Sequence, residues 1–299
     1  MSTCCKCKRI LNDSQGWYGL HENCFMKWFD LDEICKFADI IPKSQSSQTL
    51  SENHGINASF FQGAFRKYSS RLGKHNYILK VAQNEHPELP VTEFVCNQIY
   101  EYLKVQIPKY YLIRYPNDQF CFVTKNFMAE FKNSSLVHIY HYLKNKKEHN
   151  CEQLISIIGA NTGRRTEQER FVYLTLVDSL IGNHDRHGRN LAFIQSPKGN
   201  ILAPFYDNPS FVGLDDDSML GADLQPRGAI FTKASTEPTM KDYIIEWNRL
   251  GYDHVIANFK KNLRIENIEA IINKSNLSEK RKAALFRLIC KRREELCEN

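Results

Sequence analysis

The feature that most constrains the fold is an apolar segment that ends in a dense group of charged and polar residues. The stretch LVDSLIGNHDRHGRNLAFIQ covers residues 176–195. The segment before it predicts a helix, because apolar residues recur at helical spacing from Val172, Thr166 and Glu169 have capping-box spacing, and Gly182 suits a helix end. After it, LAFIQ and ILAPFY flank the turn SPKGN and predict a hairpin. The charged group therefore lies in a loop between a buried helix and a hairpin.

The spacing inside this loop is typical of a phosphoryl-transfer site. Asp185 is followed by four residues and then by Asn190, and Asp207 ends the hairpin in PFYDN. Phosphoryl transfer needs a carboxylate beside the attacking hydroxyl and oxygen ligands that hold Mg²⁺ against the nucleotide phosphates. We therefore expect Asp185 to be the catalytic base, and Asn190 and Asp207 to bind Mg²⁺. Asp and Asn also serve merely as caps and turn residues, and it is the surrounding helix and hairpin that favour the catalytic interpretation.

Three further residues of the loop have competing interpretations. His184 and His187 can be taken with Asp185 for a metal site. We expect instead that the two histidines orient the loop, with His187 among the residues that bind the nucleotide. Arg186 is expected to pair with a nearby acidic or phosphorylated group.

The part of the chain before about residue 133 predicts a small sheet with one helix. AFRKYSSRL and NYILKVA flank a turn at Gly73, while KYYLIR and QFCFVTKNF flank the turn YPND. Between these pairs, PVTEFVCNQIYEYLKV has apolar residues near helical spacing. The pattern after about residue 133 is mainly helical apart from the hairpin, so the fold class is α+β.

A lysine in the predicted sheet indicates where a nucleotide binds. Lys80 lies in the middle of NYILKVA, where a charged side chain is anomalous unless its amine reaches a cleft, and a kinase needs such a lysine for the α- and β-phosphates. Glu93, near the start of the next helix, is either the ion-pair partner of Lys80 or only a favourable first-turn acid, and both interpretations stay open. Gly63 is the flexible residue of FFQGAFRKYSS, with Lys67 four positions later.

Half of the ten cysteines lie in the first 35 residues. The pairs Cys4-x-x-Cys7 and His21-x-x-Cys24 can close a tetrahedral zinc site, and so short a segment has too little apolar surface to fold unaided. We therefore expect a structural Zn²⁺ bound by Cys4, Cys7, His21 and Cys24. The alternatives are Cys5 in place of Cys4, free surface thiols, and palmitoylation of CCKC.

Composition excludes several classes of protein. The chain has 299 residues, of which 42% are hydrophobic, and no uncharged apolar run approaches the roughly 18 to 20 residues that span a bilayer. The N-terminus lacks the apolar core of a signal peptide, so we expect a cytoplasmic protein without a transmembrane segment. Much of the net charge of +6 lies in SEKRKAALFRLICKRREELCEN, which is better explained by a solvated helix face than by direct sequence-specific binding of nucleic acid.

These motifs together resemble the kinase domain of the HipA family, which are bacterial toxin kinases. The similarity runs from about residue 53 to the C-terminus and is carried by FFQGAFRKY, YILKVA with HPELPVTEFVCNQIY, IPKYYLI, FVTKNF, IGNHDRHGRN and PFYDN. It implies a two-lobed protein-kinase-like fold with a small N-lobe sheet and a mostly helical C-lobe, here preceded by the zinc-knuckle-like segment. The expected division is a Cys-rich segment at 1–42, a linker at 43–53, an N-lobe at 54–130 and a C-lobe at 131–299.

The resemblance also implies which residues bind ATP. It implies that Asp185 is the catalytic base, that Asn190 and Asp207 bind Mg²⁺, and that Lys80 contacts the nucleotide phosphates. It places Gly63 and Lys67 in the loop that covers the phosphates, and Thr124 and Asn126 in the hinge against which adenine packs. Phe65 stands where the family usually has Gln, and Asn126 where its hinge usually has Arg, so these two positions depart from the family pattern.

A function and partners follow from the same resemblance. It implies an ATP- and Mg²⁺-dependent serine/threonine kinase toxin that phosphorylates an aminoacyl-tRNA synthetase, which can carry its tRNA, or another translation protein, and that is held by HipB- or HipS-like antitoxins. Because only the Cys-rich segment precedes the glycine loop, the chain is closer to the short HipT toxin of three-gene HipBST-type systems. Members phosphorylate a serine in the glycine loop, and Ser59 is the nearest candidate.

Two other functions stay open on the sequence. The order D-R-H-x-x-N in DRHGRN also occurs in phosphoinositide-type lipid kinases, although no other segment resembles their membrane loop. The degenerate loop around Gly63 favours a nucleotide-binding pseudokinase that acts as a regulatory module, although the retained set Lys80, Asp185, Asn190 and Asp207 disfavours it.

Overall fold

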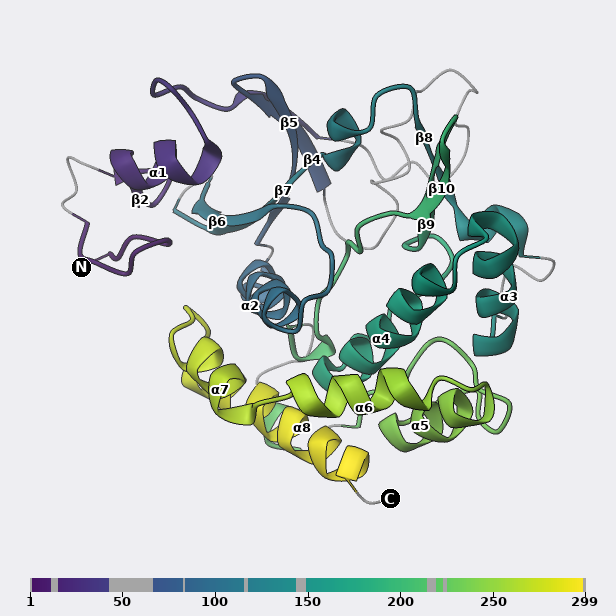
Figure 1. The fold of residues 1–299 in the computed structure, drawn as a ribbon. Helices are drawn as coiled ribbons and strands as arrows, with labels where there is room; N and C mark the ends of the chain where they lie inside the picture. Colours follow the sequence, from purple (N-terminus) through teal and green to yellow (C-terminus); the bar gives the residue numbers. More distant parts are fainter. Residues whose placement is uncertain are drawn as a thin grey trace. The chain divides into compact units, whose positions relative to one another are not determined.

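The chain packs as two compact units in a computed structural model (Figure 1). The structure describes residues 2–11, 16–42, 67–82, 84–115, 118–143, 149–213, 219–222 and 225–297. The first unit is Met1–Phe94 with Pro108–Glu130, and the second is Val95–Ile107 with Phe131–Asn299. The linker predicted at 43–53, together with Ser59, Gly63 and Phe65, lies outside the described residues.

The first unit is built on a five-stranded antiparallel sheet. Its order is β3-β4-β5-β7-β6. The strands are β3 (Ala38–Pro42), β4 (Lys67–Leu72), β5 (His75–Val81), β6 (Tyr110–Arg114) and β7 (Phe120–Lys125), and the short 3₁₀ helix η2 (Phe127–Glu130) follows β7. The β4–β5 hairpin turns at Gly73, whose φ of 55° is easily adopted by glycine. Four of these strands agree with the prediction from alternation, whereas β3 was not predicted.

The register gives the sheet one face that carries lysines. Directly opposed residues of neighbouring strands share a face, so Lys67 of β4, Lys80 of β5 and Phe122 of β7 form one row. Helix α2 (Leu89–Tyr102) starts in this unit, and Phe94 meets Tyr110 with 5.4 Å between ring centroids. The first turns of α2 therefore contact the face that carries Lys80.

The opposite face is covered by aromatic residues from the N-terminal segment. That segment forms β1 (Gly16–Trp17), β2 (Leu20–His21) and α1 (Glu22–Phe29) before β3. Phe29 stacks on Tyr111 at 4.2 Å between centroids, and Phe29 and Phe37 meet Tyr77 edge-on at 5.6 and 5.8 Å. Phe25, Phe29, Tyr77 and Tyr111 are all buried. We call residues 16–37 the aromatic cover; it supplies much of the core of this unit.

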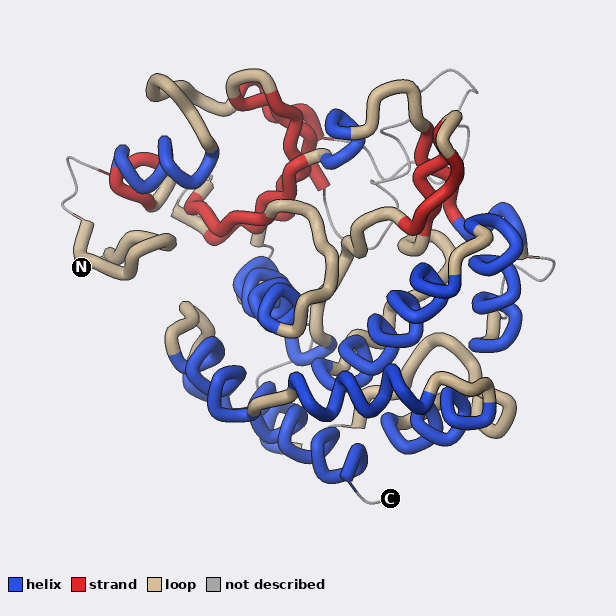
Figure 2. Tube along the Cα trace, in the orientation of Figure 1, coloured by secondary structure: helices blue, strands red, loops and turns tan. Residues whose placement is uncertain are grey.

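The second unit is mainly helical (Figure 2). It contains the C-terminal turns of α2 and the helices α3 (Cys151–Thr162), α4 (Arg165–Ile181), α5 (Met240–Arg249), α6 (Asp253–Asn262), α7 (Ile265–Asn273) and α8 (Glu279–Cys297). A three-stranded sheet of order β10-β9-β8 consists of β8 (Ser135–His138), β9 (Ala192–Ser196) and β10 (Gly199–Leu202). The short 3₁₀ helices are η3 (Ile139–Tyr142), η4 (Phe211–Gly213) and η5 (Met219–Gly221). Among the described helices, none has a stretch both long and apolar enough to cross a membrane.

Helix α4 is the central helix of this unit and ends where the sequence predicts. Every residue from Leu174 to Ile181 is buried, so the helix has no solvent face in its last turns. Gly182 caps it with φ 72°, and a Cβ there would lie 2.7 Å from Cγ of Pro226. The expected capping box at Thr166 is wrong, because α4 already begins at Arg165 and no side chain caps it.

Candidate functional site

The loop after α4 is organised by one buried arginine. Arg186 donates from Nε and Nη2 to the two carboxylate oxygens of Asp178, at 2.9 and 3.0 Å. It also donates from Nη2 to Oδ1 of Asn208 at 2.6 Å and from Nη1 to the carbonyl of Tyr206 at 2.7 Å. Its partners at 206 and 208 are the two neighbours of Asp207, so Arg186 fixes the segment that carries Asp207 to the loop that carries Asp185. Burial disfavours the charged guanidinium, but the Asp178 carboxylate more than offsets this and raises the pKa of Arg186.

Asp178 is the residue of this network that sequence reasoning missed. Besides Arg186, it accepts hydrogen bonds from the hydroxyl of Tyr100 and from Nδ2 of Asn183, the latter at 2.9 Å. Asn208 in turn donates from Nδ2 to Oδ1 of Asn97, at 3.1 Å. The signal was present in the sequence as a carboxylate within the apolar run of α4. A buried carboxylate needs a cation and donors, and this one has both.

Asn190 closes the loop on itself. Its Nδ2 donates to the carbonyl of Asp185 at 2.6 Å, and its Oδ1 accepts from the backbone N–H of His187 at 2.8 Å. An amide oxygen has two lone pairs, so Oδ1 can hold the loop with one and still be a metal ligand with the other. The Asp–x4–Asn spacing thus gives a closed loop with the Asp185 side chain 63% exposed.

Asp185 and Asp207, the two acidic residues predicted from spacing, both influence the imidazole of His187. Oδ1 of Asp185 lies 3.5 Å from Nε2 of His187. Partial burial lowers the pKa of His187, and the carboxylates of Asp185 and then Asp207 oppose that shift. Asp207 has φ 55°, in the left-handed region that few residues other than glycine adopt. The structure therefore brings Asp185, His187, Asn190 and Asp207 into one neighbourhood of the second unit.

The histidine metal site considered as an alternative is not formed. His184 is exposed and lies edge-on to Phe211 at 6.1 Å between ring centroids. His184, His187 and Asp185 do not converge as a ligand group in the part of the chain that the structure describes.

In the first unit, the structure pairs Lys80 with Glu93. Nζ of Lys80 lies 2.6 and 2.7 Å from the two carboxylate oxygens of Glu93, and both residues are buried. Glu93 is therefore the ion-pair partner of Lys80, one of the two interpretations that the sequence left open. Lys67, which is 5% exposed, shares a face and a register position with Lys80. Two buried lysines therefore lie opposite each other on this face, an arrangement suited to an anion.

The predicted hinge residues lie at the end of β7. Thr124 is opposite Ile78 of β5, on the face that carries Lys80. Asn126 follows the strand; its backbone N–H donates to the carbonyl of Asn76 at 2.8 Å, and its Oδ1 accepts from the N–H of Met128 at 3.0 Å. Asn126 thus orders the turn into η2.

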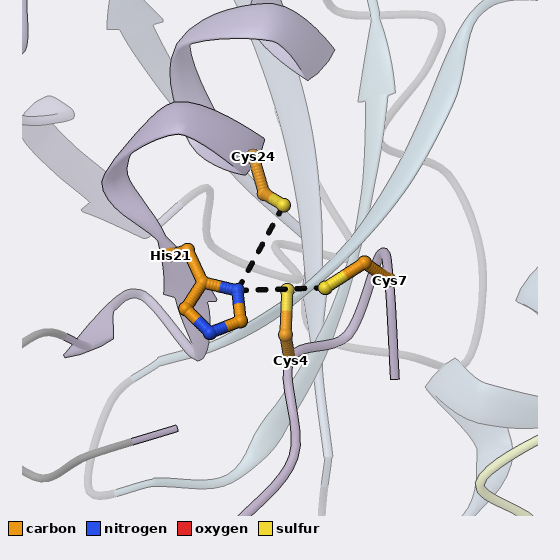
Figure 3. A group of neighbouring side chains, drawn as sticks. All are labelled: Cys4, Cys7, His21 and Cys24. Atoms are coloured by element: carbon orange, nitrogen blue, oxygen red, sulfur yellow. Dashed lines mark hydrogen bonds between the residues drawn. The ribbon is translucent and has the colours of Figure 1, made fainter. Parts of the chain in front are cut away.

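The four predicted zinc ligands also converge, and Figure 3 shows them together. The sulfurs of Cys4, Cys7 and Cys24 and a ring nitrogen of His21 all lie within 4.8 Å of one another. Burial acts to raise the pKa of the Cys4 thiol, but backbone N–H groups, first that of Cys7, hydrogen-bond to its sulfur and lower the pKa to about 7. Cys5 is buried outside this group, and its burial raises its pKa to about 11.

Comparison with known proteins identifies the family and the fold of the chain. Residues 54–283 match the family model of the HipA-like C-terminal domain. A protein of Haemophilus influenzae named "Putative kinase" is 30% identical over 152 residues, which is 44% of this chain and 44% of that protein's length. The proinflammatory kinase CtkA of Helicobacter pylori has a similar fold, with a TM-score of 0.65 and 19% identity over 77% of this chain and 90% of that one.

A second solved structure shares the fold. HipA of Shewanella oneidensis, in a complex with HipB and operator DNA, matches with a TM-score of 0.58 and 13% identity, over 89% of this chain and 73% of that one. These matches confirm the predicted α+β, two-lobed, kinase-like fold. Since the family model covers most of the sequence, the chain belongs to the family of HipA-like C-terminal domains.

Proposed function

We propose that this protein is an ATP- and Mg²⁺-dependent serine/threonine protein kinase. Its family and its similarity to a "Putative kinase" support a phosphotransferase. The observation that carries the proposal is the Arg186 network. One side chain joins the loop of Asp185 and Asn190 to the neighbours of Asp207, which is what a site with two carboxylates and one amide requires.

In this proposal each residue has a distinct task. Asp185, whose side chain is largely exposed, accepts a hydrogen bond from the substrate hydroxyl and orients it. Asn190 and Asp207 hold Mg²⁺, since one amide oxygen and one carboxylate fit the oxygen donors that this ion prefers. When bound, Mg²⁺ neutralises charge on the nucleotide phosphates. Lys80, which is ion-paired with Glu93, contacts the phosphates of ATP.

The remaining nucleotide contacts come from the other predicted residues. Gly63 belongs to the loop that covers the phosphates, and Lys67, at the start of β4, contacts the phosphates from the sheet. Thr124 and Asn126 border the adenine, and His187 orients the catalytic loop. These roles rest on the family resemblance and on three positions in the structure: Lys67 lies opposite Lys80, Thr124 lies on the same face of the sheet as Lys80, and His187 lies beside Asp185.

The proposed substrate is a cytoplasmic translation protein, with an aminoacyl-tRNA synthetase, alone or carrying tRNA, as first candidate. The Shewanella HipA structure contains HipB and operator DNA. We accordingly propose a toxin that is held by a HipB- or HipS-like antitoxin, itself binds no DNA sequence directly, and phosphorylates itself.

The test is transfer of labelled phosphate from ATP. The purified chain is incubated with Mg²⁺ and a panel of aminoacyl-tRNA synthetases, with and without tRNA, and phosphoserine and phosphothreonine are mapped by mass spectrometry. Asp185→Asn should reduce transfer by about a thousandfold or more while ATP binding is retained. Phosphoinositide vesicles form a separate arm. Label in lipid alone would replace the protein-kinase proposal with a lipid kinase, and ATP binding without transfer to any acceptor would indicate a pseudokinase.

A further inference from the structure

We propose that Cys4, Cys7, His21 and Cys24 bind one structural Zn²⁺, and that this ion fastens the aromatic cover to the face of the sheet opposite Lys80. The proposal does not depend on the kinase function, because it concerns the stability of the first unit. The spacing of the residues in the sequence predicted a zinc site. The structure adds the geometry of the ligands, the choice of Cys4 over Cys5 as the third sulfur ligand, and the part of the fold that the ion supports.

The ligand atoms lie at distances that suit a tetrahedral ion. With Zn–S of about 2.3 Å and Zn–N of about 2.0–2.1 Å, a tetrahedral site has S···N separations of about 3.5 Å and S···S separations of about 3.8 Å. Nδ1 of His21 lies 3.4 Å from Sγ of Cys7 and 3.9 Å from Sγ of Cys24. Figure 3 shows the Cys4 sulfur beside these atoms, and all four ligand atoms lie within 4.8 Å of one another. Small side-chain adjustments therefore suffice to close the site.

The hydrogen bonding of His21 selects the tautomer that binds a metal. Nε2 lies 3.1 Å from the carbonyl of Ile10, and a carbonyl oxygen can only accept, so Nε2 carries the proton. Nδ1 then has its lone pair directed at the thiols of Cys7 and Cys24. A ligating histidine that donates its other N–H to a backbone carbonyl is the usual arrangement around zinc.

The backbone presents the ligands in two rigid pairs. Cys4 and Cys7 lie on a tight turn, in which the N–H of Lys8 donates to the carbonyl of Cys4 at 2.9 Å and Lys8 has φ 63°. His21 is the N-cap of α1, and Cys24 is in the first turn of that helix. Cys5 contributes its backbone N–H to the carbonyl of Gly19 at 2.9 Å and lies outside the cluster, which decides between Cys4 and Cys5.

The hairpin of β1 and β2, which ends at His21, also contacts the sheet. The N–H of Arg114, at the end of strand β6, donates to the carbonyl of Tyr18 at 2.8 Å. A Cβ on Gly19 would lie 2.7 Å from Cγ of Arg114, so the turn beside His21 approaches this strand as closely as glycine permits. Four residues after Cys24, Trp28 meets Tyr111 edge-on at 5.6 Å. Along this short segment, residues of the Cys–His cluster therefore alternate with residues that contact the sheet.

This segment has little regular secondary structure, and apart from the cluster it is held mainly by its aromatic side chains. It contains a pair of strands of two residues each and one helix of eight residues, and an isolated helix shorter than about 12 residues is marginal in water. A metal ion that joins Cys4 and Cys7 to His21 and Cys24 crosslinks the first turn of the chain to the start of α1. Metal-binding free energy of such small segments is folding free energy. Loss of the ion should therefore release the cover from Tyr77 and Tyr111.

The metal content is the first test. The full chain, purified through a histidine-free tag without chelator, should contain one equivalent of zinc by mass spectrometry. Protein refolded with Co²⁺ should show the thiolate charge-transfer and tetrahedral absorption bands of a sulfur-rich cobalt site. Absence of stoichiometric metal in both experiments, or iron in place of zinc, would overturn the proposal.

Single substitutions separate a metal site from a group of free thiols. Cys7 is exposed, so Cys7→Ser should be almost neutral without a metal, whereas the proposal predicts loss of zinc. Cys7→His should restore binding, because it supplies a ligand of a different type at the same position. Cys35→Ser, at a half-buried cysteine outside the cluster, and Cys5→Ala should retain one equivalent. Full zinc content in Cys7→Ser refutes the assignment.

Hydrogen–deuterium exchange tests the fastening role. In Cys7→Ser, amides of β6 and of Tyr77 should exchange at least about tenfold faster than in the parent and in Cys35→Ser. Amides of α4, in the second unit, should be unchanged. If zinc is lost from Cys7→Ser while β6 keeps its protection, the ion binds but does not fasten the cover, and that half of the proposal is wrong.

Discussion

Replacing Arg186 should destabilise the second unit more than replacing any exposed residue of the same loop. Its side chain is 2% exposed and that of Asp178 is 6% exposed. Hydrogen bonds to a charged group contribute about 1.5–3 kcal/mol each, but desolvation of the guanidinium cancels much of that gain. Removal of one partner from a buried pair costs about 3–5 kcal/mol, so we expect Arg186→Met to lower the free energy of unfolding by about 4 kcal/mol.

A double-mutant cycle isolates the pair from the rest of the network. Asp178→Asn keeps acceptors for Tyr100 and Asn183 while removing the charge, and should cost about 3 kcal/mol. The double variant should cost about 2 kcal/mol less than the sum of the single ones, because neither charge is then left without its partner. Urea denaturation followed by circular dichroism measures all three.

The control is Arg189→Met in the same loop. Arg189 is exposed and lies over the Tyr140 ring at 4.7 Å, so its loss should cost about 1 kcal/mol or less. Two results would refute the reasoning: equal costs for Arg186→Met and Arg189→Met, or strict additivity of Arg186→Met and Asp178→Asn.

Three more predictions concern separate parts of the chain. Glu93→Gln removes the carboxylate of the Lys80 ion pair and should weaken binding of a fluorescent ATP analogue about tenfold, about 1.4 kcal/mol, whereas an unchanged dissociation constant would contradict the role of the pair. Burial lowers the pKa of His138 to about 4, so as pH falls below about 6.5 the unfolded chain takes up a proton before the folded chain does. The free energy of unfolding should therefore fall by about 1 kcal/mol per pH unit between pH 6 and 4. His138→Asn should flatten that slope in urea titrations at several pH values. Gly182→Ala should lower the free energy of unfolding by about 3 kcal/mol and Gly163→Ala by about 1 kcal/mol, since both glycines have positive φ but only a Cβ at 182 meets Pro226. Equal shifts of the melting temperature would show that packing at Gly182 is unimportant.

Local patterns made much of the fold predictable. Strands β4 to β7 and the hairpin after α4 follow alternation and turn residues, and α4 follows helical spacing. The closeness of Asp185 and Asn190 could be predicted because they lie five residues apart, so their relation is fixed by a single loop. The convergence of Cys4, Cys7, His21 and Cys24 could be predicted for the same reason, since each pair has its own short spacing.

Longer-range features were not visible in the sequence. Whether Glu93 pairs with Lys80 depends on how α2 lies against β5, which no local pattern specifies. The role of Asp178 was missed, because its partners Arg186 and Tyr100 are brought to it only by folding. Strands β3 and β8 pair with β4 and β9, which are far from them in the sequence, so no local hairpin turn marks them. The capping box was wrong because α4 already begins at Arg165, so Thr166 lies inside the helix, and Glu169 contacts His254, which is far away in the sequence.

The source of the negative charge that neutralises Arg186 has a consequence for control of the protein. Asp178 belongs to the preceding helix, so the loop acquires its shape as soon as the chain folds and needs no added phosphate to maintain it. In the proposed kinase, the loop therefore needs no phosphorylation step to reach this shape. Control of the proposed activity would then act on access to the site, either by withholding one of the reactants or by covering the exposed carboxylate of Asp185 with another molecule.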